Sequence, residues 1–257
     1  TADGEYTVAD PWRPLGGIAE LTESQKDAAR AALASWAAMA NIVFVEVADD
    51  AGGSGTLRFA WTASPTDEQA HTFSPDTTER AGDVWLNSLA PWDGFAAGTY
   101  GYSTLVHEIG HALGLKHSFE GTTVLPAAED GYASTIMSYT ADAGRPGSWV
   151  EFEPATPMLY DILAIQALYG ANAGHRIGDD TYVFVQGQRY FQALWDAAGN
   201  DTIVWQATDA LAFYGSYAEG YTVADIGRVL RAINRPGQSV ENLVDLSPVV
   251  ADNRELG

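Results

Sequence analysis

One stretch of eleven residues constrains this chain more than any other: HEIGHALGLKH, which runs from His107 to His117. Residues i and i+4 share one face of a helix, so His107 and His111 can bind one metal ion together. Gly114 can adopt positive φ and end the helix, which lets the chain turn so that His117 returns as a third nitrogen ligand. Three imidazoles with an open coordination position are typical of a catalytic zinc site.

The motif also supplies a base. Glu108 follows the first ligand directly, where its carboxylate can reach a metal-bound water. Three histidines, a Glu and a Gly at these offsets arise by chance in on the order of one chain in 10⁵, which disfavours a surface helix with incidental histidines. The other two histidines, His71 and His175, fall in polar, loop-like segments, and we expect ordinary surface residues there.

Composition excludes several classes of protein. The 257 residues are 46% hydrophobic and 18% charged, which is the balance of a folded globular protein. The chain has no Cys, which excludes disulfides, thiol catalysis and thiolate metal sites. Its 34 Asp and Glu against 13 Lys and Arg give a formal charge of −21, which disfavours nucleic acids and anionic membranes as partners. No apolar stretch approaches the roughly 18 to 20 residues of a membrane span, so we expect no membrane insertion.

Periodicity and capping signals predict the secondary structure. One helix begins after a capping box at Thr22 and runs through Met39, a second begins near Gly101 or Ser103 and ends at Leu113, and a third follows Pro157. In the third helix, five apolar residues are predicted to pack on the core: Leu159, Ile162, Leu163, Ile165 and Leu168. Strands are predicted at Ile42–Val47, Thr56–Trp61, Asp83–Leu86, Thr181–Val185, Thr202–Trp205 and Leu211–Tyr214. The Gly-rich residues 52–55 lack the Lys-Ser/Thr of a phosphate loop and are predicted to be a turn.

A second motif, Thr-Ile-Met-Ser-Tyr at residues 135–139, identifies the family that the chain resembles. Met137 beneath a tri-histidine zinc would supply an apolar floor, and Tyr139 would supply a phenol near the metal. A zinc motif followed by such a Met-turn is the metzincin signature. The Met-Ser-Tyr sequence within it resembles the serralysin family of bacterial secreted metalloproteases.

The resemblance covers most of residues 18–206, and more loosely extends to Asn242. It includes residues 22–47, residues 82–87 and the helix at residues 161–172. It implies an α+β fold with a metzincin catalytic domain over residues 1–175, built from a twisted, mostly parallel sheet and long helices with zinc in the cleft. A small β-rich C-terminal domain would occupy residues 176–257, without the Gly-Asp-rich repeat array that serralysins usually carry.

Family roles transfer to matching positions. The resemblance implies that His107, His111 and His117 bind zinc, with Tyr139 as a displaceable fourth ligand that later donates a hydrogen bond to the oxyanion. Glu108 would be the general base, and Met137 would support the site without binding the metal. The segment Gly82–Leu86 would be the cleft-edge strand that pairs with an extended peptide.

Acidic loops after residue 175 resemble the interdomain calcium loops of the family. One ion would be bound by carbonyls and carboxylates of six residues: Arg176, Gly178, Asp180, Asp196, Ala198 and Asp201. A second would use Gly199, Asp201, Ser239 and Glu241. Two positions depart from the family, with Asp at 180 in place of Thr and Ala at 198 in place of Gly, and ordinary acidic turns remain the alternative.

The sequence therefore predicts a secreted, extracellular zinc endopeptidase of the metzincin class, with structural calcium. We expect a monomer whose partners are protein or peptide substrates and a proteinaceous inhibitor. Zero Cys disfavours astacin-like enzymes, which normally carry disulfides. The alternative from another class is a non-catalytic binding module, stabilised by zinc or calcium, that docks to extracellular or surface-layer protein.

Overall fold

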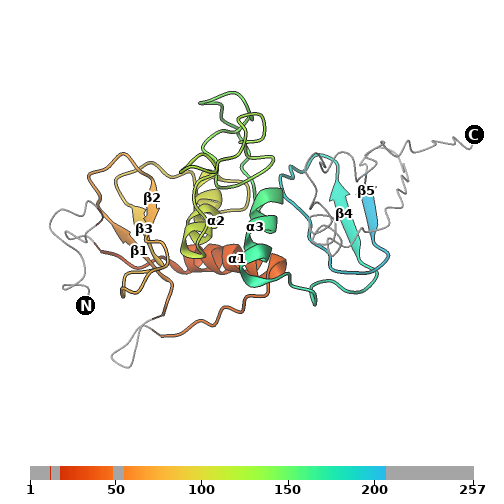
Figure 1. Cartoon of the computed structure of the whole chain (residues 1–257), viewed down its shortest axis with the longest axis horizontal. Helices are drawn as coiled ribbons and strands as arrows, with labels where there is room; N and C mark the ends of the chain where they lie inside the picture. The colour runs from red at the N-terminus through yellow and green to blue at the C-terminus, as the bar shows by residue number, and fades with distance from the viewer. Residues whose placement is uncertain (1–11, 13–17, 49–54, 207–257) are drawn as a thin grey trace, which may run out of the picture.

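The computed structural model describes residue 12 and residues 18–48 and 55–206. Three helices, α1 (Glu23–Met39), α2 (Tyr100–Ala112) and α3 (Leu159–Tyr169), lie between two small sheets (Figure 1). The first sheet contains β1 (Arg58–Thr62), β2 (Ala70–Thr72) and β3 (Asp83–Asn87), and the second contains β4 (Thr181–Val185) and β5 (Thr202–Gln206). None of the described helices has the length and apolar character needed to cross a membrane.

The helices begin and end close to where the sequence predicts. At the start of α1, the N–H of Thr22 donates to the side-chain oxygen of Gln25 at 2.9 Å, which is half of the predicted capping box. Helix α2 ends at Ala112, and Gly114 follows with a φ of +98°. Helices α1 and α2 pack together through the core, where the buried Trp36 indole N–H donates to the carbonyl of Val106 at 3.0 Å.

The first sheet has the strand order β1-β3-β2. Strand β3 pairs in parallel with β1 and antiparallel with β2, so half of the pairings in this sheet are parallel, whereas the sequence predicted a mostly parallel sheet. All five residues of β3 are buried, and both β2 and β3 contact α2. Because β3 is central, the prediction that residues 82–86 form the edge strand is wrong, and β2 occupies that edge.

Two other predictions fail for related physical reasons. Residues 42–47 keep the predicted alternation, with Ile42 and Phe44 packed on the core and Val43 85% exposed, but they pair with no strand in the described part of the chain. In α3, Ile162 and Ile165 are buried, whereas three leucines are exposed: Leu159, Leu163 and Leu168. Periodicity identifies apolar faces but not whether a neighbour covers them.

The C-terminal region is described only in part. Strands β4 and β5 form where predicted and pair in parallel. The predicted strand Leu211–Tyr214 lies outside the described residues, so the β-rich C-terminal domain is not confirmed. The division into domains at residues 175 and 176 stays a prediction. Asn172 is tied to α1, because its side-chain N–H donates to the carbonyl of Ala37 at 2.8 Å.

Candidate metal centre

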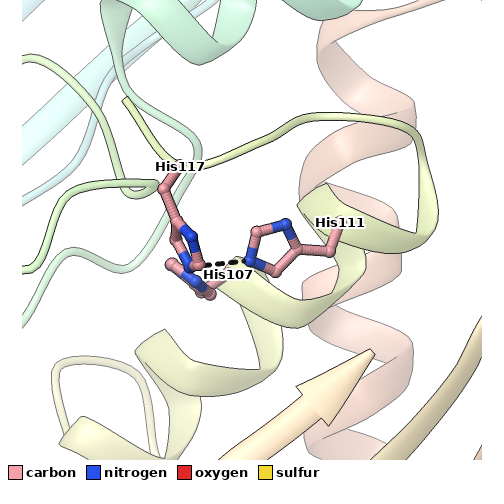
Figure 2. Close-up of side chains that lie close together, drawn as sticks. All are labelled: His107, His111 and His117. Atoms are coloured by element: carbon pink, nitrogen blue, oxygen red, sulfur yellow. Dashed lines mark hydrogen bonds between the residues drawn. The ribbon is translucent and has the colours of Figure 1, made fainter. Parts of the chain in front are cut away.

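The three motif histidines converge on one point. His107 and His111 project from the same face of α2, and His117 approaches from the segment that follows Gly114 (Figure 2). One ring nitrogen from each lies within 4.8 Å of the others, and the Nε2 atoms of His111 and His117 are 3.1 Å apart. Ligand atoms about 2.0–2.1 Å from a tetrahedral zinc are about 3.3 Å from one another, so the observed spacing fits a shared metal ion.

Contacts in which Nδ1 faces an acceptor oxygen fix the tautomer of each ring. His107 Nδ1 donates to the carbonyl of Ile136 and His111 Nδ1 to the carbonyl of Leu115, both at 2.8 Å. His117 Nδ1 faces Glu120 Oε2 at 3.2 Å. With the proton held on Nδ1, each Nε2 presents a lone pair, and lone pairs that face each other at 3.1 Å repel unless a cation lies between them.

The electrostatics also favour metal ligands. Burial, followed by the neighbouring histidines, lowers the pKa of His107 to about 3. Burial lowers the pKa of His111 to about 4, and it lowers that of His117 as well. The three imidazoles are therefore neutral at pH 7, the form that coordinates a metal.

Glu108 lies beside the ligands in a protected position. Burial raises its pKa to about 7, although a hydrogen bond donated by the Thr72 hydroxyl at 2.7 Å opposes that shift. A carboxyl group poised near neutral pH is suited to general base work. Thr72 belongs to β2 and is separated from Glu108 by 36 residues, so no sequence motif could have identified it.

The Met-turn lies below and beside the histidines. Met137 is buried against α2, where a Cβ added to Gly110 would lie 2.7 Å from its Sδ. Tyr139 is exposed, and its hydroxyl lies 2.8 Å from His117 Nε2, within reach of the same ion. Although the residue as a whole is exposed, desolvation of its phenol, followed by the charge of Glu108, raises the pKa of Tyr139 to about 12.

Asp161 holds the Met-turn in place, a role that sequence reasoning missed. This buried carboxylate accepts hydrogen bonds from the Thr135 hydroxyl, from the backbone N–H of Ile136 at 2.7 Å and from that of Met158 at 2.8 Å. The carbonyl of Ile136 in turn accepts a hydrogen bond from His107 Nδ1. Asp161, at the start of α3, thus orients the ring of His107 on α2.

A cleft of about 320 Å³ opens over Glu108 and His107. Its walls include Tyr139 of the Met-turn and the segment 67–70 that leads into β2. His71 lies on β2, stacked on Trp12 with ring centroids 5.4 Å apart, and not in a loop as predicted. His175 lies after α3, away from this site.

The predicted calcium residues are brought together in part. Carboxylate oxygens of Asp180, Asp196 and Asp201 lie within 4.8 Å of one another. Gly199 packs on the carbonyl of Gly178 so closely that an added Cβ would lie 2.0 Å from that oxygen. The predicted ligands Arg176 and Ala198 border this cluster, since Arg176 pairs with Asp180 at 3.7 Å and Ala198 N–H donates to Asp196. Ser239 and Glu241 lie outside the described residues.

Comparison with known proteins gives the same family as the motifs. The matrixin family model (Peptidase_M10) matches residues 18–130. Serralysin G of Dickeya chrysanthemi is 34% identical over 225 residues, which cover 76% of this chain and 46% of that protein. A serralysin of Photorhabdus sp. (strain Az29) is 32% identical over 75% of this chain and 44% of that protein. The metalloprotease AprA of Pseudomonas entomophila is 31% identical over 74% of this chain and 45% of that protein.

The chain thus matches less than half the length of each of these relatives. The matched part contains all three histidines, Glu108 and Tyr139. The comparisons confirm the resemblance that the motifs predicted, because the chain is similar to serralysin-type metalloproteases over about three quarters of its length and to the matrixin model over residues 18–130.

Proposed function

We propose that this chain is a secreted zinc endopeptidase that hydrolyses peptide bonds of extended protein substrates. The observation that carries the proposal is the convergence of three neutral imidazoles beside Glu108 at the floor of an open cleft. Three nitrogen ligands with one open side are the donor set of catalytic zinc. A bound zinc ion would supply a Lewis acid and an acidified water.

The chain's own residues supply the proton transfer and the orientation. Glu108 takes a proton from the attacking water and delivers it to the leaving amine. Thr72 donates a hydrogen bond to one oxygen of Glu108, whose side chain is among those that line the cleft. Tyr139, whose hydroxyl keeps its proton at neutral pH, donates a hydrogen bond to the developing oxyanion.

An extended substrate would bind along β2. Residues 67–70 line the cleft, and in the described part of the sheet β2 pairs only with β3. Its other edge can therefore accept a peptide strand by backbone hydrogen bonds. This position replaces the strand at residues 82–86, whose two edges are already paired.

Calcium and secretion belong to the same proposal. The cluster of Asp180, Asp196 and Asp201 offers hard oxygen ligands suited to calcium, with Arg176, Gly178, Ala198 and Gly199 supplying backbone oxygens. Ser239 and Glu241 would complete a second calcium site. An acidic chain without Cys that requires calcium would suit an extracellular setting.

The test is digestion of an unstructured protein such as reduced, alkylated casein, with and without a zinc chelator. Glu108→Ala should lose at least about 10³-fold in kcat/KM while still binding one zinc per chain by elemental analysis. Glu79→Gln, which removes an exposed carboxylate that does not line the cleft, is the matched control and should cleave like the wild type. Cleavage that resists the chelator, or full activity of Glu108→Ala, would overturn the mechanism. Zinc binding by a chain that cleaves nothing would favour the binding-module alternative.

A further inference from the structure

A groove continues from the cleft past Tyr139. Three tyrosines, Tyr100, Tyr132 and Tyr139, line both the cleft and the groove. The far side of the groove is formed by residues 147–151 and by Glu153. A side chain of a substrate bound in the cleft can therefore enter the groove between aromatic walls.

Glu153 is the unusual group in this groove. The residue is only 7% exposed, and within the described chain its carboxylate has neither a hydrogen-bond donor nor a cation as a partner. Among the described residues, Thr62 Oγ1 is the only polar side-chain atom that is both fully enclosed and without a partner. The carboxylate oxygens of Glu153 are therefore not fully enclosed, and they reach the solvent through the groove that the residue lines. A buried carboxylate without a partner is unfavourable unless a ligand pairs with it.

The backbone holds Glu153 rigidly. Its N–H donates to the carbonyl of Gly98 at 2.8 Å, and the ring of Phe152 packs directly on Gly98. Pro154 is fully buried on the other side. These contacts fix the backbone position from which the Glu153 side chain lines the groove.

The other two acids of the groove already have partners. Asp93 accepts hydrogen bonds from the backbone N–H groups of Tyr100 and Gly101, at 3.0 and 3.1 Å, at the start of α2. Glu151 is exposed and pairs with Arg189 at 3.3 Å. Neither Lys nor Arg is among the described residues that line the cleft or the groove. Burial, with a contribution from Asp93, raises the pKa of Glu153 to about 7, as expected of a charge that lacks compensation.

We propose that Glu153 is a specificity-determining residue that binds a Lys or Arg side chain of the substrate in the groove beside the cleft. The ammonium or guanidinium group would pair with the Glu153 carboxylate, while the methylene stem would pack on Tyr100 and Tyr132. Burial raises the pKa of both phenols, and the charge of Glu153 raises it further, which is consistent with phenols that lie close to that carboxylate. The inference rests on the proposed protease function, because the cation arrives as part of a peptide.

The first experiment maps cleavage of a mixed peptide library by mass spectrometry to find the position that prefers Lys or Arg. Paired peptides that differ only in Lys or norleucine at that position then give a ratio of kcat/KM. We expect the wild type to prefer Lys by on the order of 10- to 100-fold, and Glu153→Gln to lose most of that ratio. Glu151→Gln, an equal change of charge on the rim of the same groove, should keep it.

A binding assay separates this inference from the proposed function. In the Glu108→Ala background, fluorescence anisotropy compares the affinity of the Lys and norleucine peptides with and without Glu153→Gln. Lys-selective binding that Glu153→Gln abolishes supports the inference even if the wild type cleaves nothing. Cleavage with equal rates for the two peptides, or an equal loss of the ratio in Glu151→Gln, overturns it while leaving the protease function intact. If Glu153→Gln fails to fold, the wild-type ratio alone decides, since a value near one refutes the pairing.

Discussion

Gly110 should be needed for space beneath the metal centre, and Gly110→Ala tests this. An added Cβ would lie 2.7 Å from Met137 Sδ and 3.1 Å from Trp36 Cζ2, whereas ordinary contacts lie near 3.5–4.0 Å. Trp36 is fully buried and tied to Val106 by its indole N–H, so it cannot retreat. The sulfur of Met137 must therefore move by about 1 Å, or α2 must shift and carry His107 and His111 with it.

Two opposing contributions set the size of the effect. Ala in place of Gly inside a helix stabilises by about 1 kcal/mol, and overpacking of a filled core costs about 1–3 kcal/mol. We expect a net destabilisation of about 1 kcal/mol, which lowers Tm by about 3 °C. We expect the zinc affinity to fall by about 10-fold, because the ligands on either side of Gly110 are displaced.

A double-mutant cycle isolates the clash. Met137→Ala alone should cost about 2–5 kcal/mol by leaving a cavity under the site. In that background the sulfur is absent, so Gly110→Ala should be neutral or stabilising, with a coupling energy of about 1–2 kcal/mol. Denaturant unfolding of the four proteins measures this coupling. Single effects that add to within about 0.5 kcal/mol would refute the packing argument.

Three further outcomes are expected. Thr72→Val removes the hydroxyl that donates to Glu108 and should lower kcat/KM by about 10-fold at unchanged zinc content, whereas Thr78→Val, outside the site, should not. Burial raises the pKa of Asp161 to about 6, above its ordinary value of 3.8, so the folded state binds that proton more tightly than the unfolded chain. This contribution is complete below about pH 3 and is lost as the pH rises through 6. Chemical denaturation should show wild-type stability falling by about 2.4 kcal/mol relative to Asp161→Asn from pH 4 to 7, and parallel pH curves would contradict the argument. Calcium at ten times its Kd should stabilise the folded chain by about 1.4 kcal/mol at fixed zinc, and so raise Tm. Asp196→Ala should abolish this rise in Tm, whereas the control Asp142→Asn should keep it. A wild-type Tm that does not respond to calcium would exclude the calcium proposal.

The convergence of the three histidines could be predicted because it is local. His107 and His111 need only one helix, and His117 needs only the turn at Gly114, so their spacing in sequence nearly determines their spacing in space. The capping box of α1 is equally local, and it forms where predicted. In each case the physical interaction spans a few residues that the sequence shows side by side.

The supporting residues could not be predicted because they come from distant segments. Thr72 reaches Glu108 from β2, and Asp161 reaches Ile136 from α3. Thr, Asp and Glu are residue types that usually lie on the surface, so nothing in the sequence marks Thr72, Asp161 or Glu108 as buried. Only the packing of the helices on the sheet buries them. The exposed leucines of α3 show the converse, since an apolar pattern does not reveal whether a neighbouring element covers it.

Because of these distant contacts, metal binding and the packing of α2, α3 and β2 would be thermodynamically linked. The ring of His107 is oriented by Ile136, whose N–H is held by Asp161 at the start of α3, while β2 holds Glu108. None of these contacts exists in an unfolded chain, so only the folded state presents converging ligand atoms. A metal ion at a hundred times its Kd then stabilises that state by about 2.7 kcal/mol. Burial of the Glu108 and Asp161 carboxyl groups acts in the opposite direction at neutral pH, since it disfavours their charged forms. A metal ion held by the three histidines would therefore offset the unfavourable burial of Glu108 and of Asp161, which orients His107 through Ile136.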